Sequence, residues 1–242
     1  MSHRPYESAM KSIVALSLLT LLTVRPAAGQ GRVSECIALG AQLAISSCLS
    51  DAYNAADADL NAAYRAVRER LAPPAASRLR EAQRGWIEFR DIDCEASVVR
   101  RPNQAWVVGA IRSACGAEHA WDRVRTLRGT GDPSLRSRLC PDSSSREAAT
   151  CVARRHEAAD AALNRTYRDL ISGMGERSAA SLREAQRAWI QFRDADCQSV
   201  GGETGATACR TIHTLDRVRT LRAHHIPDAR WESCDLMGCG GR

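Results

Sequence analysis

The sequence predicts an all-α protein built from two tandem, disulfide-linked three-helix bundle modules. A long block, LREAQRGWIEFRDIDC at residues 79–94, recurs as LREAQRAWIQFRDADC at residues 182–197. Apolar residues in the segment 49–71 recur every three or four positions, which is the period of an amphipathic helix. The chain also carries ten cysteines, an even number that favours a disulfide framework in an exported protein. Nothing between the predicted helices resembles a strand.

The N-terminal segment has the layout of a secretory signal peptide. One lysine after Met10 precedes an apolar run from Ile13 to Leu22, and small residues follow. We expect Met10 to be the true start and cleavage to follow Gly29, so residues 1–29 are excluded from the fold. A membrane anchor is the alternative, but the run is short for a bilayer span. We therefore expect a periplasmic or secreted protein with no stable membrane anchor after cleavage.

The repeat sets the domain boundaries. The segment DRVRTLR at residues 122–128 recurs unchanged at residues 216–222, and the stretch that follows its first copy is rich in Gly, Pro and Ser. We divide the remaining chain into a first module at 30–128, a linker at 129–138, a second module at 139–223 and a C-terminal tail at 224–242.

Each module is predicted to hold three helices. In the first module, the first helix covers the segment 49–71 and is stopped by the proline pair that begins at Pro73. The second helix begins near Ser77, and the third runs through Cys115 to Leu127.

A set of polar residues is predicted to form a structural network between the first two helices. If these helices form a hairpin, Asn61 lies beside Arg90, and Asp57 lies beside Asp93. A partly buried guanidinium needs such partners, because an unpaired one is costly. We expect the network to fix the register of the helices rather than to act in catalysis. Its members are Asp57, Asn61, Gln83, Arg90 and Asp93 in the first module, and Asp160, Asn164, Gln186, Arg193 and Asp196 in the second.

The cysteines divide into two sets of four and a pair in the tail. Four cysteines allow three pairings in each module. The short loop between the second and third helices of module two places Cys197 opposite Cys209, which leaves the other two cysteines to fasten the N-terminal arm. The favoured pairs are therefore Cys36–Cys48, Cys94–Cys115, Cys140–Cys151, Cys197–Cys209 and, in the tail, Cys234–Cys239.

The sequence offers little evidence for other chemistry. Patterns such as CxxC, GxSxG and HExxH do not occur, so we expect no enzymatic activity. His119 and His213 hold equivalent positions and are interpreted as surface or core-edge histidines. A zinc site formed by tail histidines with Cys234 and Cys239 is a weaker alternative to the disulfide, and we expect no cofactor and no metal. The formal charge of +6 is not concentrated in a cluster interleaved with aromatics, which argues against nucleic-acid binding.

The repeated motifs resemble those of the LprI-type family, whose domain occurs at the N-terminus of the lysozyme-inhibitor lipoprotein LprI. The resemblance rests on LNxxY at residues 60–64 and 163–167, on LREAQRxWIxFRDxDC, and on a cysteine-bearing third helix that ends in RTLR. It implies a small disulfide-linked helical bundle that inhibits lysozyme or another peptidoglycan hydrolase. The alternative is a periplasmic structural or envelope-stress protein with no hydrolase target. The motifs do not identify the inhibitory residues.

Overall fold

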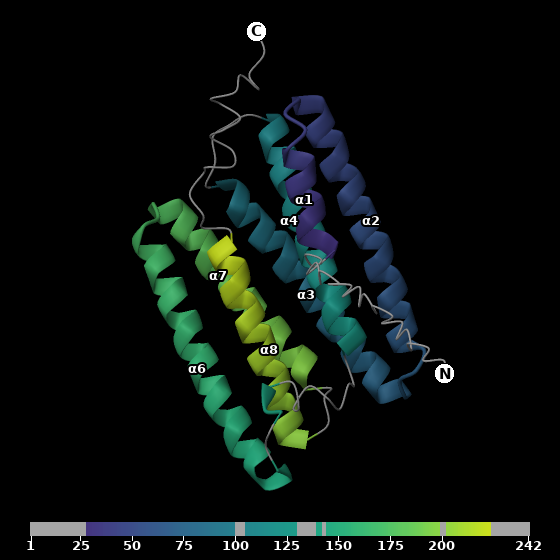
Figure 1. Ribbon diagram of the computed structural model, residues 1–242, viewed down its shortest axis with the longest axis vertical. Helices are drawn as coiled ribbons and strands as arrows, with labels where there is room; N and C mark the ends of the chain where they lie inside the picture. Colours follow the sequence, from purple (N-terminus) through teal and green to yellow (C-terminus); the bar gives the residue numbers. More distant parts are fainter. Residues whose placement is uncertain (1–27, 100–104, 130–138, 142–143, 199–201, 224–242) are drawn as a thin grey trace, which may run out of the picture.

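The computed structural model describes residues 28–99, 105–129, 139–141, 144–198 and 202–223. Helices account for nearly all of these residues, and no strand occurs among them, so the all-α prediction is confirmed. Figure 1 shows the helices as elongated rods in two groups. They are α1 (Ala28–Ile37), α2 (Gln42–Arg68), α3 (Pro73–Val99) and α4 (Ala105–Gly129), followed by α6 (Ser145–Ser172), α7 (Glu176–Cys197) and α8 (Gly202–Ala223).

The helix boundaries follow from local sequence. Helix α3 begins at Pro73, four residues before the predicted start at Ser77, because proline fits the first turn of a helix, where its missing N–H is not needed. Helix α6 begins after a capping box, in which the Ser144 hydroxyl accepts a hydrogen bond from the Glu147 backbone N–H. The turn between α1 and α2 contains Gly40 at φ 73°, a conformation that glycine adopts without the strain of a Cβ atom.

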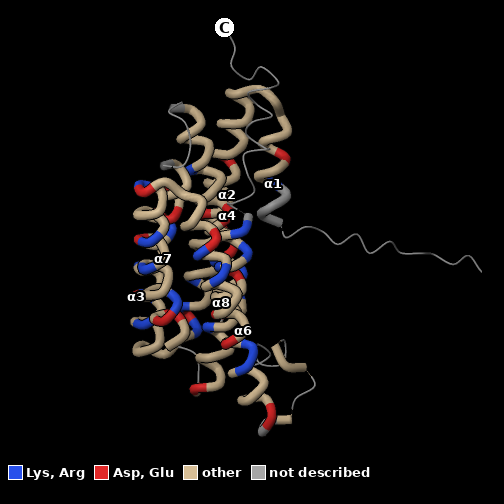
Figure 2. Tube along the Cα trace, turned by 90° about the vertical axis from the view of Figure 1, so that its left-hand side faces the viewer, with Lys and Arg blue, Asp and Glu red and all other residues tan. Residues whose placement is uncertain are grey.

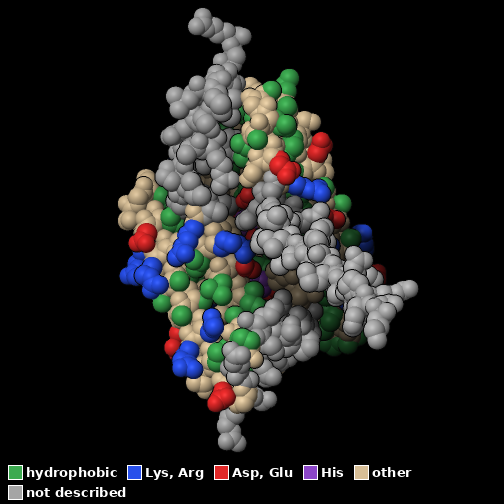
Figure 3. Space-filling view, viewed as in Figure 1, with side chains coloured by type: hydrophobic (Ala, Val, Ile, Leu, Met, Phe, Trp, Pro, Cys, Tyr) green, Lys and Arg blue, Asp and Glu red, His purple; other side chains and the backbone are tan. Residues whose placement is uncertain are grey.

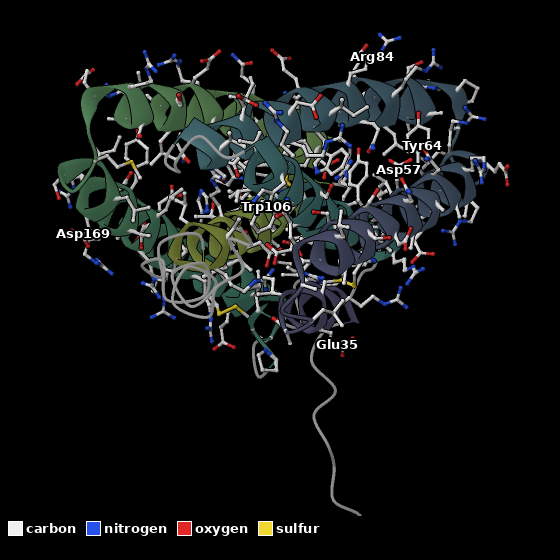
Figure 4. The ribbon with its side chains drawn as sticks, turned by 90° about the horizontal axis from the view of Figure 1, so that it is seen from above. Glu35, Asp57, Tyr64, Arg84, Trp106 and Asp169 are labelled. Carbon is white, nitrogen blue, oxygen red and sulfur yellow. A yellow bond between two sulfur atoms is a disulfide. The ribbon has the colours of Figure 1, made fainter. Side chains whose placement is uncertain are left out.

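The two modules share one packing plan, and their central helices join them. Helix α2 packs on α4, and α6 packs on α8 in the same way. Between the modules, α3 packs along α7, and this is the main contact that joins them. Figure 4 shows that α2 and α3 meet at their turn and then diverge, and that α6 and α7 do the same on the other side. The modules are therefore open wedges, whose central helices lie side by side.

A continuous apolar core passes through both modules. It includes Leu49 and Trp86 of the first module together with Leu182 and Trp189 of the second, all nearly inaccessible to solvent. A smaller cluster around Val152 lies beneath the start of α6. Because burial of apolar surface is the main favourable contribution to folding, this shared core makes the two modules one packed unit.

Several predicted segments lie outside the described residues. These are nearly all of the signal peptide, the linker after Gly129, and the tail with Cys234 and Cys239. Among the helices that the structure does describe, none combines the length and the apolar character needed to cross a bilayer.

Candidate functional site

The helices that join the modules carry two reciprocal buried ion pairs. Arg123 of α4 donates to both carboxylate oxygens of Asp196 in α7, each at 2.8 Å. Arg217 of α8 donates to both oxygens of Asp93 in α3, at 2.8 and 2.9 Å. Each pair therefore links one module to the other, and the same contact occurs twice with the roles of the modules exchanged. Parallel double hydrogen bonds of this kind are among the strongest that side chains form.

Each aspartate is also held by a histidine of its own module. His119 Nε2 lies 3.0 Å from an oxygen of Asp93, and His213 Nε2 lies at the same distance from an oxygen of Asp196. Both rings are buried, so the expectation of surface or core-edge histidines is corrected. It was wrong because spacing along one helix does not reveal that a carboxylate on the neighbouring helix supplies a partner inside the core.

Burial and pairing act in opposite directions on the two carboxyl groups. Burial raises the pKa of Asp93, but the Arg217 guanidinium and the His119 ring outweigh it and hold that pKa well below its usual value. For Asp196, the same opposition between burial and the pair formed by Arg123 and His213 also lowers the pKa. Both aspartates are therefore charged at neutral pH, and they complete a paired network rather than a reactive site.

Aromatic rings pack against the ion pairs at the crossing of α3 and α7. Phe89 and Phe192 stack nearly parallel, with ring centroids 6.1 Å apart. The guanidinium of Arg217 lies over the Phe89 ring, and that of Arg123 lies over the Phe192 ring, each at 5.0 Å from the centroid. A cation above an aromatic face is attracted by the ring quadrupole, so the rings add to the attraction between the modules.

A second acidic pair lies near the same crossing. Burial raises the pKa of Asp216, and the neighbouring charge of Asp122 raises it further, although Arg219 opposes both effects. The Arg219 guanidinium bridges the two carboxylates, at 3.0 Å from Asp216 and 3.7 Å from Asp122. This arginine belongs to module two and Asp122 to module one, so it forms a further contact between the modules.

The structure divides the predicted polar network into two groups. Asp93 and Asp196 belong to the ion pairs between the modules, and Gln83 and Gln186 each bind one of the arginines from within its own module. The Gln83 amide oxygen accepts from Arg123 Nε at 3.1 Å, and the Gln186 amide oxygen accepts from Arg217 Nε at 3.2 Å. The remaining residues form local contacts, and the expectation of one network per module is therefore corrected. It assumed that the first two helices lie close together along their length, whereas α2 and α3 diverge.

The local contacts lie within or beside the wedge. Asn61 donates to Asp57 one turn earlier in α2. Arg90 donates to its neighbour Asp91, and its guanidinium lies over the Trp86 ring at 5.1 Å. In Figure 4, Asp57 and Tyr64 project from α2 into the wedge, whereas Arg84 points away from it. In module two, Arg193 likewise bonds to its neighbour Asp194 and approaches Asp160 at 3.9 Å, while Asn164 is exposed to solvent.

The structure pairs the module cysteines in the arrangement that the loop lengths favoured. The four disulfides are Cys36–Cys48, Cys94–Cys115, Cys140–Cys151 and Cys197–Cys209. In each module, one disulfide fastens the segment before the first long helix, and the other joins the second long helix to the third.

The described residues include two groups whose atoms are close enough to hold a metal ion. They are Cys94, Cys115 and His119 in module one, and the equivalent Cys197, Cys209 and His213 in module two. A metal takes cysteine as the thiolate, and these sulfurs are joined as disulfides. The geometry therefore fits disulfide-bonded core residues and not a metal site.

Module one contains a groove with a volume of about 370 Å³. Tyr53, Arg90, Arg112 and Gly116 line it, and Arg112 forms an ion pair with Glu95 at 2.7 Å on its rim. At the positions that correspond to Tyr53 and Gly116, module two has His156 and Arg210. Because charged side chains line it, this groove can accept a polar group.

The two modules also match a family model separately. The model described as "Lysozyme inhibitor LprI" matches residues 36–127 and again residues 140–221, which together exceed half of the chain. The chain belongs to the LprI family. Two matches in one chain agree with the two tandem copies that the repeated sequence predicted.

Relatives of this LprI-family chain add information about its fold. It is 39% identical over 66 residues to "Uncharacterized protein R02472" of Rhizobium meliloti (strain 1021), a match over 22% of this chain and 48% of the relative. The chain thus spans about half the length of that curated relative. A crystal structure of an uncharacterized protein from Burkholderia thailandensis matches with a TM-score of 0.55 and 22% identity, over 83% of this chain and 96% of that chain. That likeness supports the arrangement of helices alone.

Sequence reasoning missed the two arginines that join the LprI modules. Arg123 and Arg217 occupy the second position of the two identical DRVRTLR segments, so the repeat did contain a signal for them. Each of these segments holds three arginines, however. Only burial distinguishes the first arginine of each segment from the other two, since Arg123 is 1% exposed and Arg217 is 2% exposed.

Proposed function

We propose that this LprI-family chain is an exported, non-enzymatic inhibitor that binds a lysozyme-type cell-wall hydrolase. The observation that carries this proposal is the family match, which covers both modules and is described as a lysozyme inhibitor. The disulfide framework supports export, because such bonds persist in oxidising compartments.

The rigidity of the fold supports a role in binding. Four disulfides, a shared core and the reciprocal ion pairs hold the helices in one arrangement. A binding partner that is already ordered loses less conformational entropy on association, so more of its contact energy appears as affinity. Figure 2 shows basic and acidic positions interspersed along the helices, which favours recognition by local shape and contacts over long-range steering.

The engaged carboxylates argue against hydrolysis by this chain. A glycosidase needs two carboxyl groups that face one substrate, one as acid and one as base or nucleophile. The Asp93 carboxylate is buried and bound by Arg217 and His119, whereas Asp91 is exposed on another face of α3. Asp196 is buried in the same way, so these groups serve structure.

An inhibition assay tests the proposed function. The purified, oxidised protein is added to suspensions of bacterial cell wall with each of several lysozyme-type hydrolases, and the decrease in turbidity is followed. We expect slower clearing with at least one hydrolase, and loss of the effect after the disulfides are reduced. If tens of micromolar protein slows none of them, the inhibitor function is wrong, and a structural role in the envelope becomes the better explanation.

A further inference from the structure

We propose that the groove of module one binds a short stretch of neutral glycan, of the kind formed by the N-acetylated amino sugars of the cell wall. Residues of α2, α3 and α4 line this groove, which has a volume of about 370 Å³. Pockets for small ligands span roughly 300–1,000 Å³, so a ligand the size of a disaccharide fits. This site goes beyond the proposed inhibition, because its ligand is the glycan and not the hydrolase.

The walls of the groove are held in place by the fold. Gly116 of α4 is buried, and a Cβ atom there would lie 2.6 Å from the Tyr53 ring, so glycine at this position lets the ring pack directly on α4. The Cys94–Cys115 disulfide joins α3 to α4 at the same place, and Cys94 also lines the groove. A site that is already ordered loses little conformational entropy when its ligand binds.

The charged side chains that line the groove balance one another. Arg90 pairs with Asp91 at 2.8 Å, and Arg112 pairs with Glu95 at 2.7 Å. An anion would meet the two carboxylates, and a cation would meet the two guanidiniums, so either charge is repelled by half of the lining. An apolar ligand would remove water from all four charged groups without replacing its hydrogen bonds. The lining therefore favours a ligand that is polar and uncharged.

The surroundings do not change this preference. Figure 2 shows basic and acidic positions interspersed along the helices. On the face of the molecule that Figure 3 shows, basic and acidic side chains are likewise scattered among uncharged ones. A strong field of one sign, which would draw a charged ligand toward module one, needs a surface on which one charge predominates. Selection of the ligand therefore depends on the groups inside the groove.

Sugar hydroxyl groups match the hydrogen-bonding groups of the lining. A guanidinium only donates and a carboxylate only accepts, whereas a hydroxyl does both, so neighbouring hydroxyls of one sugar can bind Arg112 and Glu95 together. Hydrogen bonds to charged groups are stronger than those between neutral groups. The Tyr53 ring adds an apolar surface for the C–H groups of the sugar, since ligand pockets combine aromatic walls with a few polar groups.

Module two keeps the fold with a different set of side chains at this place. Its residues at the positions of Tyr53, Glu95, Arg112 and Gly116 are His156, Gln198, Ala206 and Arg210. The Arg210 guanidinium donates to Thr207 at 3.1 Å, and Thr207 corresponds to Ser113 of the groove. A long side chain thus lies along the face of α8 that glycine leaves open on α4. The fold does not require the lining found in module one, which supports a separate role for it.

Calorimetric titration of the oxidised, full-length protein with chitotriose, a neutral oligomer of N-acetylglucosamine, tests the site. We expect saturable binding to the wild type and binding weakened by about tenfold or more in Arg112→Ala, because a hydrogen bond to a charged group is removed. Arg112 is 53% exposed, so the variant should fold, which circular dichroism verifies. Arg84→Ala is the matched control and should bind as the wild type does, since this exposed arginine of α3 points away from the wedge.

A second variant tests the balance of charge. Glu95→Gln introduces the amide that module two has at this position and leaves the lining of the groove with a net positive charge. It should weaken the binding of chitotriose and allow inorganic phosphate to bind, whereas phosphate should not bind to the wild type. If phosphate binds to the wild type and Arg112→Ala removes that binding, the groove is an anion site and the glycan assignment is wrong.

The remaining outcomes separate the glycan site from the inhibitor function. No saturable binding at about 10 mM chitotriose overturns the site, and so does binding that Arg112→Ala leaves unchanged, because the sugar then lies elsewhere. A protein that slows a hydrolase in the turbidity assay but does not bind chitotriose retains the inhibitor function without the glycan site. A protein that binds chitotriose through Arg112 but slows no hydrolase retains the glycan site without the inhibitor function.

Discussion

Arg123 of α4 binds Asp196 of α7 through two hydrogen bonds of 2.8 Å, although the residues lie 73 positions apart and in different modules. Arg217 and Asp93 repeat this contact in the opposite direction. The duplicated chain therefore resembles a symmetric dimer whose two halves have been joined, with each half supplying the cation for the carboxylate of the other. Neither module can satisfy its buried charges alone, so the reciprocal pairs make the folding of the modules interdependent.

Replacement of one buried arginine should strongly destabilise the whole chain. We expect Arg123→Met to lower the free energy of unfolding by about 3–5 kcal/mol, because Asp196 would remain buried without its main partner. Urea denaturation of the oxidised protein measures the change. Arg112→Met is the control: its pair with Glu95 is about half exposed, so its loss should cost less than about 1 kcal/mol. Equal effects of the two substitutions would contradict a structural role for the buried pair.

The same aspartates predict how stability depends on pH. The folded state lowers the pKa of Asp93 and Asp196, so their contribution is complete above the unfolded value of about 3.9 and is lost as the pH falls through the folded values. We expect these groups to cause no loss between pH 7 and about pH 5, and a progressive loss below about pH 4. Denaturation curves at a series of pH values measure it.

Asp216 should have the opposite effect on the pH dependence of stability. Its pKa is raised in the folded state, so its contribution to stability increases as the pH falls through that value. Asp216→Asn should remove this increase, while Asp93→Asn should instead weaken the loss at low pH and destabilise the protein at pH 7. If the wild-type protein loses stability steadily from pH 7 to 5, titratable groups other than these aspartates dominate the pH dependence in that range.

The sequence predicted the helices and modules because those features depend on residues close together in the chain. The spacing of apolar residues reports one face of one helix, and the repeat reports the module. It could not reveal the partner of Arg123, which comes from another module, nor that α2 and α3 diverge. For the same reason, Arg90 was given a central role that the structure gives to Arg123. Arg90 pairs with an exposed neighbour, so Arg90→Met should cost much less than Arg123→Met.

Loss of a disulfide that joins two helices should also destabilise the protein. Cys94 and Cys115 connect α3 to α4 beside the Asp93–His119 contact, and both are buried. We expect replacement of both by serine to lower the free energy of unfolding by about 2–4 kcal/mol, because the unfolded chain gains freedom. Thermal unfolding followed by circular dichroism measures the change. An unaltered melting temperature would mean that the packing of α3 on α4 holds without this bond.

Gly116 should be intolerant of even a methyl group. A Cβ atom at this position of α4 would lie 2.6 Å from the Tyr53 ring on α2, so the ring or the helices must shift. We expect Gly116→Ala to cost about 1–3 kcal/mol, as overpacking usually does. Gly109 lies in the same helix with open space around it, and Gly109→Ala should instead stabilise the helix by up to about 1 kcal/mol.

A double substitution identifies the cause. In a Tyr53→Ala background the obstructing ring is absent, so Gly116→Ala should become neutral or stabilising, and urea denaturation of the four proteins in the cycle gives the coupling energy. A cost that persists without the ring would place the constraint in the backbone of α4. If the cost vanishes, the Tyr53 ring is the group that requires glycine at position 116; module two has His156 and Arg210 at the two corresponding positions.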